Sequence, residues 1–325
     1  MHAPPLLALT WSLLPSGTTA SLRGVSAVDD RVVWASGSGG TWLRTTNSGK
    51  TWTAGQVPGA GKLDFRDVYA VDANAAYLLA SGPGDQSRIY KTMDAGRTWT
   101  LQFTNPDQAG FLDAIAFWDP QHGLAFGDPV NGRFALFVTA SGGSQWKRLN
   151  GPMAIPQEGA FAASGTCLIV TGTHDAWFGT SAARVFHSTD GGATWTTVQT
   201  PIRHDSTAAG IFSLAFADAR HGIAVGGDYM HTELSEQNIA ITSDGGRTWA
   251  EPPANHPAGY RSAVVYVPAR RAWISVGSSG SDISHDNGAT WQSFDQQAWN
   301  AISFTRAGKG WAVGPKGAVA VLSTR

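Results

Sequence analysis

Cysteine and charged residues are both scarce in this sequence. It has one cysteine among 325 residues, and 14% of the residues are charged. A single cysteine cannot form an intrachain disulfide, and Cys167 lies in the apolar run TCLIV, so we expect a buried, unreactive thiol. The formal net charge of -1 argues against a general affinity for nucleic acid or anionic membranes, although a local basic patch can still recognise an anion.

Long hydrophobic runs and metal-ligand spacings are missing as well. The apolar segment PPLLALTWSLL near the start is short and interrupted, and no basic residue precedes Arg23, so we expect neither a complete signal peptide nor a membrane span there. No cysteine and histidine spacing typical of zinc sites appears, and we expect no metal and no cofactor. The 42% hydrophobic content predicts an ordered chain with a packed core.

Glycine, proline and tryptophan are abundant instead, with 39, 16 and 14 residues, which is typical of turn-rich β proteins. A short motif recurs six times, and its tryptophans are spaced by 47, 47, 49, 54 and 42 residues. A period of this length indicates a repeat architecture. The copies are TTNSGKTW (45–52), TMDAGRTW (92–99), TASGGSQW (139–146), STDGGATW (188–195), TSDGGRTW (242–249) and SHDNGATW (284–291).

Each period contains about four short strand-like runs, which is the content of one blade of a β-propeller. After the sixth copy the chain offers three more such runs, and LALTWSLLP near the start offers the fourth, with Trp11. We therefore predict a single domain over 1–325, an all-β, seven-bladed β-propeller of four-stranded blades. A strand at about 7–14 would pair with the blade at about 298–325 and close the ring, leaving no unpaired edge.

The repeated motif suits a structural role at the turn from third to fourth strand. Its aspartate or asparagine can accept hydrogen bonds from turn N–H groups, its glycines can adopt positive φ, and its tryptophan would pack flat against a neighbouring blade. In a propeller this turn lies on the face opposite the usual ligand site. We interpret as structural the residues Asp94, Asp190, Asp244, Asp286, Trp52, Trp99, Trp146, Trp195, Trp249 and Trp291.

The motif resembles the Asp-box, S-x-D-x-G-x-T-W, also called the BNR repeat, of sialidases and of many non-catalytic propellers. With the second strands GWAVG and GIAVGG, it makes nearly the whole chain similar to the photosystem II stability/assembly factor-like family of seven-bladed propellers in the sialidase-like superfamily. The resemblance implies a protein that holds a client through an arginine-rich patch, and a periplasmic or secreted location.

An alignment of the expected inner strands shows where the blades differ. The strands are SLRGVSAV, DFRDVYAV, FLDAIAFW, QEGAFAAS, GIFSLAFA, GYRSAVVY and AWNAISFT. The residues in the fourth column of this alignment have small side chains, except for Asp67. Blades six, seven, one and two are contiguous in a closed ring, so the third column would present one basic arc of Arg261, Asn300, Arg23 and Arg66 near the mouth of the central channel. The other members of that column are Asp113, Gly159 and Phe212.

Guanidinium groups that converge at one mouth need a counterion, and their planar forks suit a carboxylate, sulfate or phosphate. We predict that the arc binds an anionic ligand or an acidic partner segment. Two alternatives stay open: Asp67 and Asp113 neutralise the arc internally, or the third column is merely solvated. On the facing blades, Asp113, Asp128 and Glu158 would make the rim acidic.

Two longer segments are expected to be second-to-third-strand loops on the same face. They are GTHDAWFGTSAA in blade four and GGDYMHTELSEQ in blade five. Long loops at the functional face usually build a binding site or a partner surface. Their candidate ligand-binding residues are His174, Asp175, Trp177, Asp228, Tyr229, His231 and Glu233.

These resemblances leave two functions open. We favour a non-catalytic, monomeric propeller that binds a protein client or an anionic small molecule or carbohydrate. The alternative is an enzyme, either a sialidase-like glycosidase acting on sialosides or uronides, with the arginines on a substrate carboxylate, or a lyase or oxidoreductase. The early F-R-I-P motif of sialidases is missing, and DFRDV in blade two resembles it only in part. The candidate catalytic residues are Tyr229 or Tyr260 with Glu158 as the nucleophile pair, and Asp67 or Asp113 as the acid.

Overall fold

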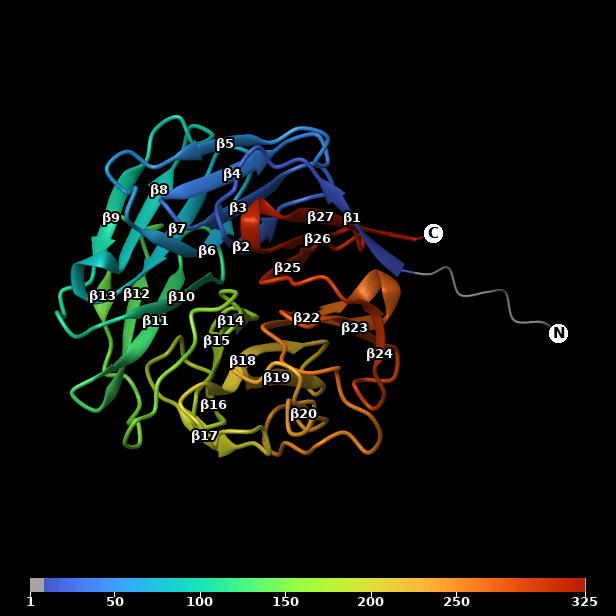
Figure 1. Cartoon of the computed structure of the whole chain (residues 1–325). Coiled ribbons are helices and arrows are strands. Elements are labelled where there is room, and N and C mark those ends of the chain that lie inside the picture. Colours follow the sequence, from blue (N-terminus) through green and yellow to red (C-terminus); the bar gives the residue numbers. More distant parts are fainter. Residues whose placement is uncertain (1–8, 325) are drawn as a thin grey trace.

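Runs of β-branched and aromatic residues, separated by turns with glycine and aspartate, form short antiparallel strands along this chain. The computed structural model describes residues 9–324. The strands make seven sheets that are arranged as a ring around a central axis (Figure 1). The predicted all-β, seven-bladed propeller is confirmed.

The strands of each blade follow one another from the axis outward. Blade one has β2 (Leu22–Ala27), β3 (Val33–Gly37), β4 (Thr41–Thr45) and β5 (Thr53–Gln56), and blade two has β6 (Asp64–Ala70), β7 (Ala76–Ser81), β8 (Arg88–Thr92) and β9 (Thr100–Thr104). Blade three has β10 (Leu112–Phe117), β11 (Gly123–Val130), β12 (Arg133–Thr139) and β13 (Lys147–Arg148), and blade four has β14 (Leu168–Thr171), β15 (Asp175–Gly179), β16 (Arg184–Ser188) and β17 (Thr196–Gln199).

Blade five has β18 (Ala209–Phe216), β19 (Gly222–Asp228) and β20 (Ile239–Thr242), and blade six has β21 (Ala263–Val267), β22 (Ala272–Gly277), β23 (Gly280–Ser284) and β24 (Gln292–Asp295). Blade seven has β25 (Ala301–Phe304), β26 (Gly310–Val313), β27 (Val319–Thr324) and β1 (Leu9–Leu14). Three short 3-10 helices, η1 (Gly84–Gln86), η2 (Pro268–Arg270) and η3 (Pro315–Gly317), lie between strands.

The seventh blade joins the two ends of the chain. β1 pairs antiparallel with β27, from Leu9 opposite Thr324 to Leu14 opposite Val319. β1 is therefore the outermost strand of the last blade, and Figure 1 shows it beside β27. The predicted closure is confirmed over 9–14; residues 7 and 8 of the expected strand lie outside the described residues.

Blade five departs from the four-strand plan. Its sheet has three strands, and a single bridge between Ile241 and Ala250 takes the place of the fourth. The repeat tryptophan Trp249 nevertheless packs in the core that blade five shares with blade four. The contact between blades thus survives where the outer ladder is lost.

The hydrophobic core is divided into interfaces between successive blades. Trp99 of blade two packs with Trp34 and Trp42 of blade one, with ring centroids 6.2 and 5.8 Å away. Their planes meet at 87° and 54°, so the predicted flat packing is wrong here; tilted and edge-on contacts suit the charge distribution of aromatic rings. Trp11 fills the equivalent position between blades six and seven.

Blade four differs most from the sequence prediction. Its innermost strand is β14, which begins at Leu168, and the segment 157–164 that we aligned as this strand is not a strand. Gly159 and Ala160 therefore do not occupy the third and fourth columns of an inner strand. The repeat led us to expect a strand where the chain takes another course.

Residues 159–166, which we call the axial segment, instead reach across the axis of the ring. They make hydrogen bonds to blades three, two, six and five in turn, which lie on different sides of the channel. The axial segment therefore fills part of the channel below the mouth. Its contacts are Ala160 N–H to Asp128 Oδ1 at 2.8 Å, Arg66 Nη1 to Ala162 O at 3.3 Å, Ser164 Oγ to Ser262 O at 2.8 Å, and the Thr166 and Ser213 hydroxyls at 2.6 Å.

Candidate functional site

Most inner strands contain a β-bulge near their start. In blades one, two, three and five the pairing register shifts across one residue of the strand. A bulge interrupts the alternation of side chains and re-aims the extra residue. The bulged residues are Arg23, Arg66, Asp113 and Phe212, which are the third column of the sequence alignment.

These four side chains line one cavity of about 520 Å³. The inner strands begin at this cavity, whereas the repeated turns follow the third strands, which run parallel to the inner ones and end on the opposite face. The cavity is therefore at the predicted mouth. Other residues that line it are Asp128, Phe161, Tyr229, Tyr260, Ser262 and Asn300.

Arg261 does not join them, because blade six is one residue out of register with our alignment. The N–H of Arg261 donates to a glycine carbonyl of the preceding blade, as the N–H of Leu22 does in blade one. Arg261 thus has the core position of Leu22, and Ser262 has the position of Arg23. A shift of one residue moves a side chain to the other face of its strand.

The Arg261 side chain is fully buried within blade six. Its Nε donates to Asp282 Oδ2 at 2.6 Å, and its Nη1 donates to Ser279 Oγ at 2.7 Å and to Tyr260 O at 2.8 Å. Its charge is neutralised there by Asp282. The prediction that Arg261 belongs to a basic arc at the mouth is wrong.

Arg23 and Arg66 form the basic side of the cavity. Arg66 Nε donates to Asp64 Oδ2 at 2.8 Å, so this arginine has its counterion two residues earlier. Arg23 has no ion-pair partner within the described chain, and its Nε is buried without a hydrogen bond. Burial, and then the charge of Arg66, lowers the pKa of Arg23. Asp67 and Asp113, the internal counterions we considered, form no ion pair with either arginine in residues 9–324.

Asp113 and Asp128 of blade three form the acidic side. Asp113 is 1% exposed, and neither of its carboxylate oxygens has a hydrogen-bond partner among the described residues. Burial, and then the neighbouring Asp128 carboxylate, raise the pKa of Asp113 well above its usual range. Burial also raises the pKa of Asp128. The two groups therefore resist ionising together.

Asp67 lies beneath the axial segment and does not line the cavity. Its Oδ1 accepts from Val68 N–H and its Oδ2 from Ile115 N–H, both at 2.8 Å. A Cβ on Gly165, whose φ is +79°, would lie 2.2 Å from Asp67 Oδ1, so this close approach requires glycine. Burial raises the pKa of Asp67 to about 7.

Glu158 does not line the cavity either. Its Oε1 accepts from Thr180 Oγ1 at 2.6 Å and from Arg184 Nε at 2.9 Å, and its Oε2 accepts from Ile155 N–H at 2.9 Å. The side chain is fully buried by these partners. The predictions that Glu158 makes the rim acidic or pairs with a tyrosine as nucleophile are therefore wrong.

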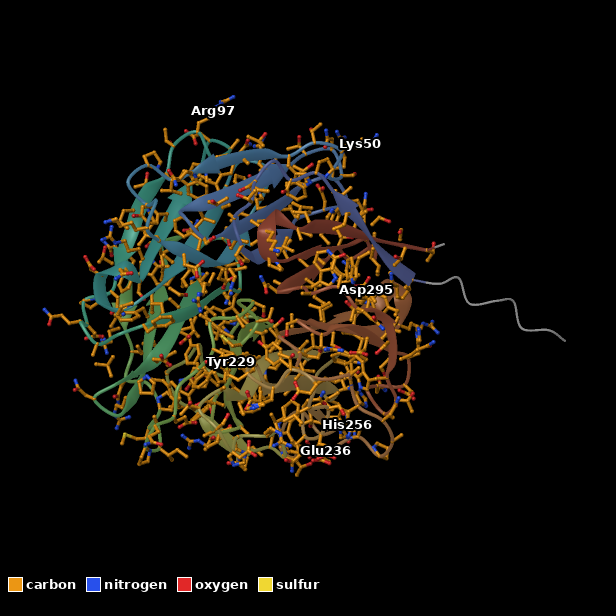
Figure 2. The ribbon with its side chains drawn as sticks, in the orientation of Figure 1. Lys50, Arg97, Tyr229, Glu236, His256 and Asp295 are labelled. Atoms are coloured by element: carbon orange, nitrogen blue, oxygen red, sulfur yellow. The ribbon has the colours of Figure 1, made fainter. Side chains whose placement is uncertain are left out.

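An aromatic wall completes the cavity along blades four to six. Phe161 of the axial segment stacks on Phe212, with centroids 3.8 Å apart and planes at 8°. Tyr260 meets Phe212 edge-on at 4.8 Å, and Tyr229 lies 6.1 Å from the same ring. Tyr229 is 48% exposed, and Figure 2 shows it toward the middle of the ring. The sequence alignment missed Phe161 because it treated 157–164 as a strand.

The predicted long loop of blade five is present. Residues 229–238 join β19 to β20 on the mouth side. Asp228, at the end of β19, is 4% exposed and accepts from Ser206 Oγ and Met230 N–H, both at 2.8 Å, so its oxygens anchor the loop. The predicted residues on the loop itself are Tyr229, His231 and Glu233, of which Tyr229 lines the cavity.

The predicted loop of blade four is wrong, because residues 175–179 in the middle of that segment form β15, and residues 180–183 alone join β15 to β16. His174 lies on the face of the repeated turns, where its carbonyl accepts from Gly191 N–H at 2.8 Å. Asp175 and Trp177 belong to β15 and do not line the cavity. Trp177 stacks on His187 with centroids 3.3 Å apart, and His187 Nε2 lies 3.0 Å from Asp175 Oδ1.

The repeated turns share one hydrogen-bond pattern. Asp190 Oδ1 accepts from Thr194 N–H at 2.8 Å, and its Oδ2 accepts from Thr194 Oγ1 at 2.6 Å. The N–H of Gly192, with φ of +90°, donates to Ser188 Oγ at 2.8 Å. Each carboxylate is thus occupied by its own turn. Asp94, Asp244 and Asp286 accept in the same way from Thr98, Thr248 and Thr290.

Three further features of residues 9–324 concern metal ligands, membrane-length helices and the single thiol. Residues 9–324 contain no group of three or more His, Cys, Asp or Glu side chains placed to hold a metal ion. Within the same residues, no helix has the length and apolar character to cross a membrane. Cys167 is fully buried, and burial raises its pKa well above the usual value.

Comparisons of sequence give one curated relative and no family. No family model matches the chain. A probable oligoxyloglucan-reducing end-specific xyloglucanase from Neosartorya fischeri is 24% identical over 226 residues. That alignment covers 63% of this chain and 26% of the relative, so the chain spans about a quarter of that protein.

Comparisons of structure give propellers that cover the whole chain. YCF48 bound to a D1 peptide has a TM-score of 0.67 and 16% identity over 100% of both chains. YCF48 from Cyanidioschyzon merolae has a TM-score of 0.65 and 16% identity over 96% of this chain and 98% of its own. A streptogramin B lyase has a TM-score of 0.69 and 12% identity, over 99% of this chain and 100% of its own. Identities this low show the fold alone: a seven-bladed propeller that resembles YCF48.

Proposed function

We propose that this protein is a non-catalytic binding propeller that recognises an acidic segment of a client protein through Arg23. The observation that carries the proposal is the Arg23 guanidinium, which lines the cavity with a buried Nε that has no partner in the described chain. Arg23 is half-buried and forms no ion pair in the described chain, although the Asp64 carboxylate acts on its pKa. A carboxylate of a ligand would match both its charge and its forked geometry. In this proposal the six repeated turns are Asp-boxes that only hold the blades.

Two observations favour a peptide over a small anion. The aromatic wall ends at exposed side chains of the blade-five loop, with Tyr229 48% and Met230 68% exposed. Exposed aromatic and methionine side chains beside a cavity suit the side chains of a protein partner. A solved structure of a similar fold, YCF48, contains a bound D1 peptide, which shows that such a propeller can hold one.

The test is an array of acetylated, C-terminally amidated hexapeptides that carry one glutamate at each position, each beside its glutamine counterpart. The labelled full-length chain should bind a subset of glutamate peptides, and Arg23→Ala should lose at least tenfold in affinity for them. Arg97→Ala is the matched control, since Figure 2 places this arginine at the outer edge of the ring. Equal binding of glutamate and glutamine peptides, or an unchanged Arg23→Ala, would overturn the proposal.

A glycosidase is the second candidate function. It is favoured by the xyloglucanase relative and by Asp113, whose raised pKa suits a proton donor at a cavity wall. Xyloglucan oligosaccharides and fluorogenic sialosides and uronides should then be hydrolysed, and Asp113→Asn should abolish turnover. Hydrolysis at the rate of a heat-denatured sample rejects this candidate.

Two accompanying proposals rest on the family resemblance. We propose that the protein is periplasmic or secreted and that it is a monomer. Fractionation of cells that express the full-length protein tests the first, and sedimentation at micromolar concentration tests the second. Retention in the cytoplasm or a concentration-dependent dimer contradicts them.

A further inference from the structure

We infer that the client segment also carries a protonated amine, a lysine side chain, which binds at Asp113 and Asp128 beside the acidic group held by Arg23. This inference rests on the proposed function and specifies its ligand. It makes the cavity a site for a segment with charges of both signs.

The first argument is the state of Asp113. Its side chain is 1% exposed, and it lines the cavity at the bulge of β10. Neither carboxylate oxygen accepts a hydrogen bond of normal geometry in the described chain; the Asp128 N–H, which also acts on the Asp113 pKa, donates to Phe111 O at 2.9 Å. Buried polar groups in folded proteins almost always have partners, so an unpartnered oxygen pair buried in the wall of a cavity indicates a ligand that donates hydrogen bonds once the side chain turns toward the cavity.

The second argument is the sign and number of the neighbouring groups. Asp128 lines the same cavity, and its charge acts on Asp113. Its Oδ1 accepts from Ala160 N–H, which leaves Oδ2 without a hydrogen bond to the described residues. An ammonium group has three donors and one positive charge, so it can bond to both carboxylates and relieve their repulsion.

Arg66 is a cation of the chain itself whose charge acts on Asp113. Its donors are directed elsewhere, because its Nε is paired with Asp64 at 2.8 Å and its Nη1 donates to Ala162 O at 3.3 Å. No ion pair between Arg66 and Asp113 is present in residues 9–324. Arg66 therefore lies between the basic and acidic sides of the cavity and leaves the Asp113 oxygens without an ion-pair partner.

The shape of the site favours lysine over a bare cation. Asp113 is buried, so its partner must enter on a long, slender stem. The lysine side chain supplies four carbons, which can lie along the stacked Phe161 and Phe212 rings. A calcium ion needs six to eight oxygen ligands, and the described residues place no group of three or more acidic, histidine or cysteine side chains for a metal.

Ionisation gives a second readout. Burial, and then the charge of Asp128, raise the pKa of Asp113, which favours its protonated form; a bound ammonium group would favour the ionised form. The other titratable groups that line the cavity are Arg23, Arg66, Tyr229 and Tyr260. Behind its wall lie Asp67, which accepts from the Ile115 N–H on the strand of Asp113, and Cys167, on which the charge of Asp113 acts. Binding of the amine near pH 7 should therefore release protons to the buffer.

The experiment uses hexapeptides with one glutamate and one lysine at every spacing. Each has two matched partners, one with norleucine for lysine and one with glutamine for glutamate. For the best peptide, replacement of lysine should weaken binding at least tenfold. Asp113→Asn and Asp128→Asn should reduce that lysine preference to below threefold. Calorimetry in two buffers of different ionisation enthalpy should show proton release.

Asp205→Asn is the charge-matched control, since this exposed carboxylate pairs with Arg203 outside the cavity. It should keep the full lysine preference. If glutamate peptides bind but lysine and norleucine peptides bind equally, the inference fails and the proposed function stands. If no peptide depends on its glutamate, the proposed function fails. Circular dichroism and thermal unfolding of each variant identify any loss of folding.

Discussion

The two faces of this propeller are built from the same repeat, yet they differ in how they use it. On one face, Asp190 and its counterparts bond to a threonine four residues later in the same turn. On the other, the bulged position of the inner strand holds Arg23, Arg66, Asp113 or Phe212, according to the blade. The residue type at the turn is the same in most blades because it stabilises the blade itself. The residue type at the bulge differs from blade to blade although the backbone geometry is the same, so these side chains can be used to bind a ligand.

The axial segment is the strongest departure from the repeat, and Gly165→Ala should have the largest effect. The added Cβ would lie 2.2 Å from Asp67 Oδ1 at a φ of +79°. Strain and overpacking together should cost about 4 kcal/mol of unfolding free energy in urea. Gly17→Ala is the matched control, because Gly17 has a φ of +77° and nothing lies within 4 Å of its Cβ. It should cost about 1 kcal/mol; equal losses would show that the axial segment is not tightly packed.

Asp67→Asn tests the buried carboxyl beneath that segment. Since burial raises the pKa of Asp67 to about 7, the folded state holds a proton that the unfolded state loses near pH 4. The wild-type protein should therefore lose stability as pH rises between these values, by about 2–3 kcal/mol from pH 5 to pH 8. The variant should lack this part of the decline in urea unfolding. Parallel pH profiles would mean that Asp67 titrates normally.

Asp190→Ala tests the uniform face. Removal of the carboxylate leaves the turn N–H and hydroxyl of Thr194 to water, and we expect a loss of about 1–2 kcal/mol in thermal unfolding. Peptide binding at the mouth should not change. A variant that keeps its stability and loses binding would reverse the assignment of the two faces.

Ser141→Asp should have the smallest effect. Ser141 has the place of the aspartate in blade three, and its Oγ accepts from Gln145 N–H at 3.0 Å. A carboxylate there can accept the same bond, and we expect a gain of about 0.5 kcal/mol. A clear loss in thermal unfolding would show that the turns are not interchangeable.

The sequence was sufficient to predict the blade count, the ring closure and, in blades one, two, three and five, the third-column residues at the mouth, because each depends on a period. It did not predict that these residues are bulged. Arg261 was misplaced because a shift of one residue in a short strand leaves the hydrophobic pattern almost unchanged while it reverses the side chain. Phe161 was missed because the repeat predicts a strand where the chain crosses the axis. Asp64 could have been found, since an aspartate two residues before Arg66 on one strand lies on the same face.

The pairing of Leu9 with Thr324 has a consequence for how the molecule is made. During synthesis the first strand emerges long before the strand that will receive it. Six blades can assemble on their neighbours as they appear, but β1 must wait for the last residues of the chain, and the closure joins its most distant parts. Until then blade seven is incomplete and Trp11 lacks its site beside blade six. The apolar side chains that β1 buries beside blade six therefore stay uncovered until β27 has been made.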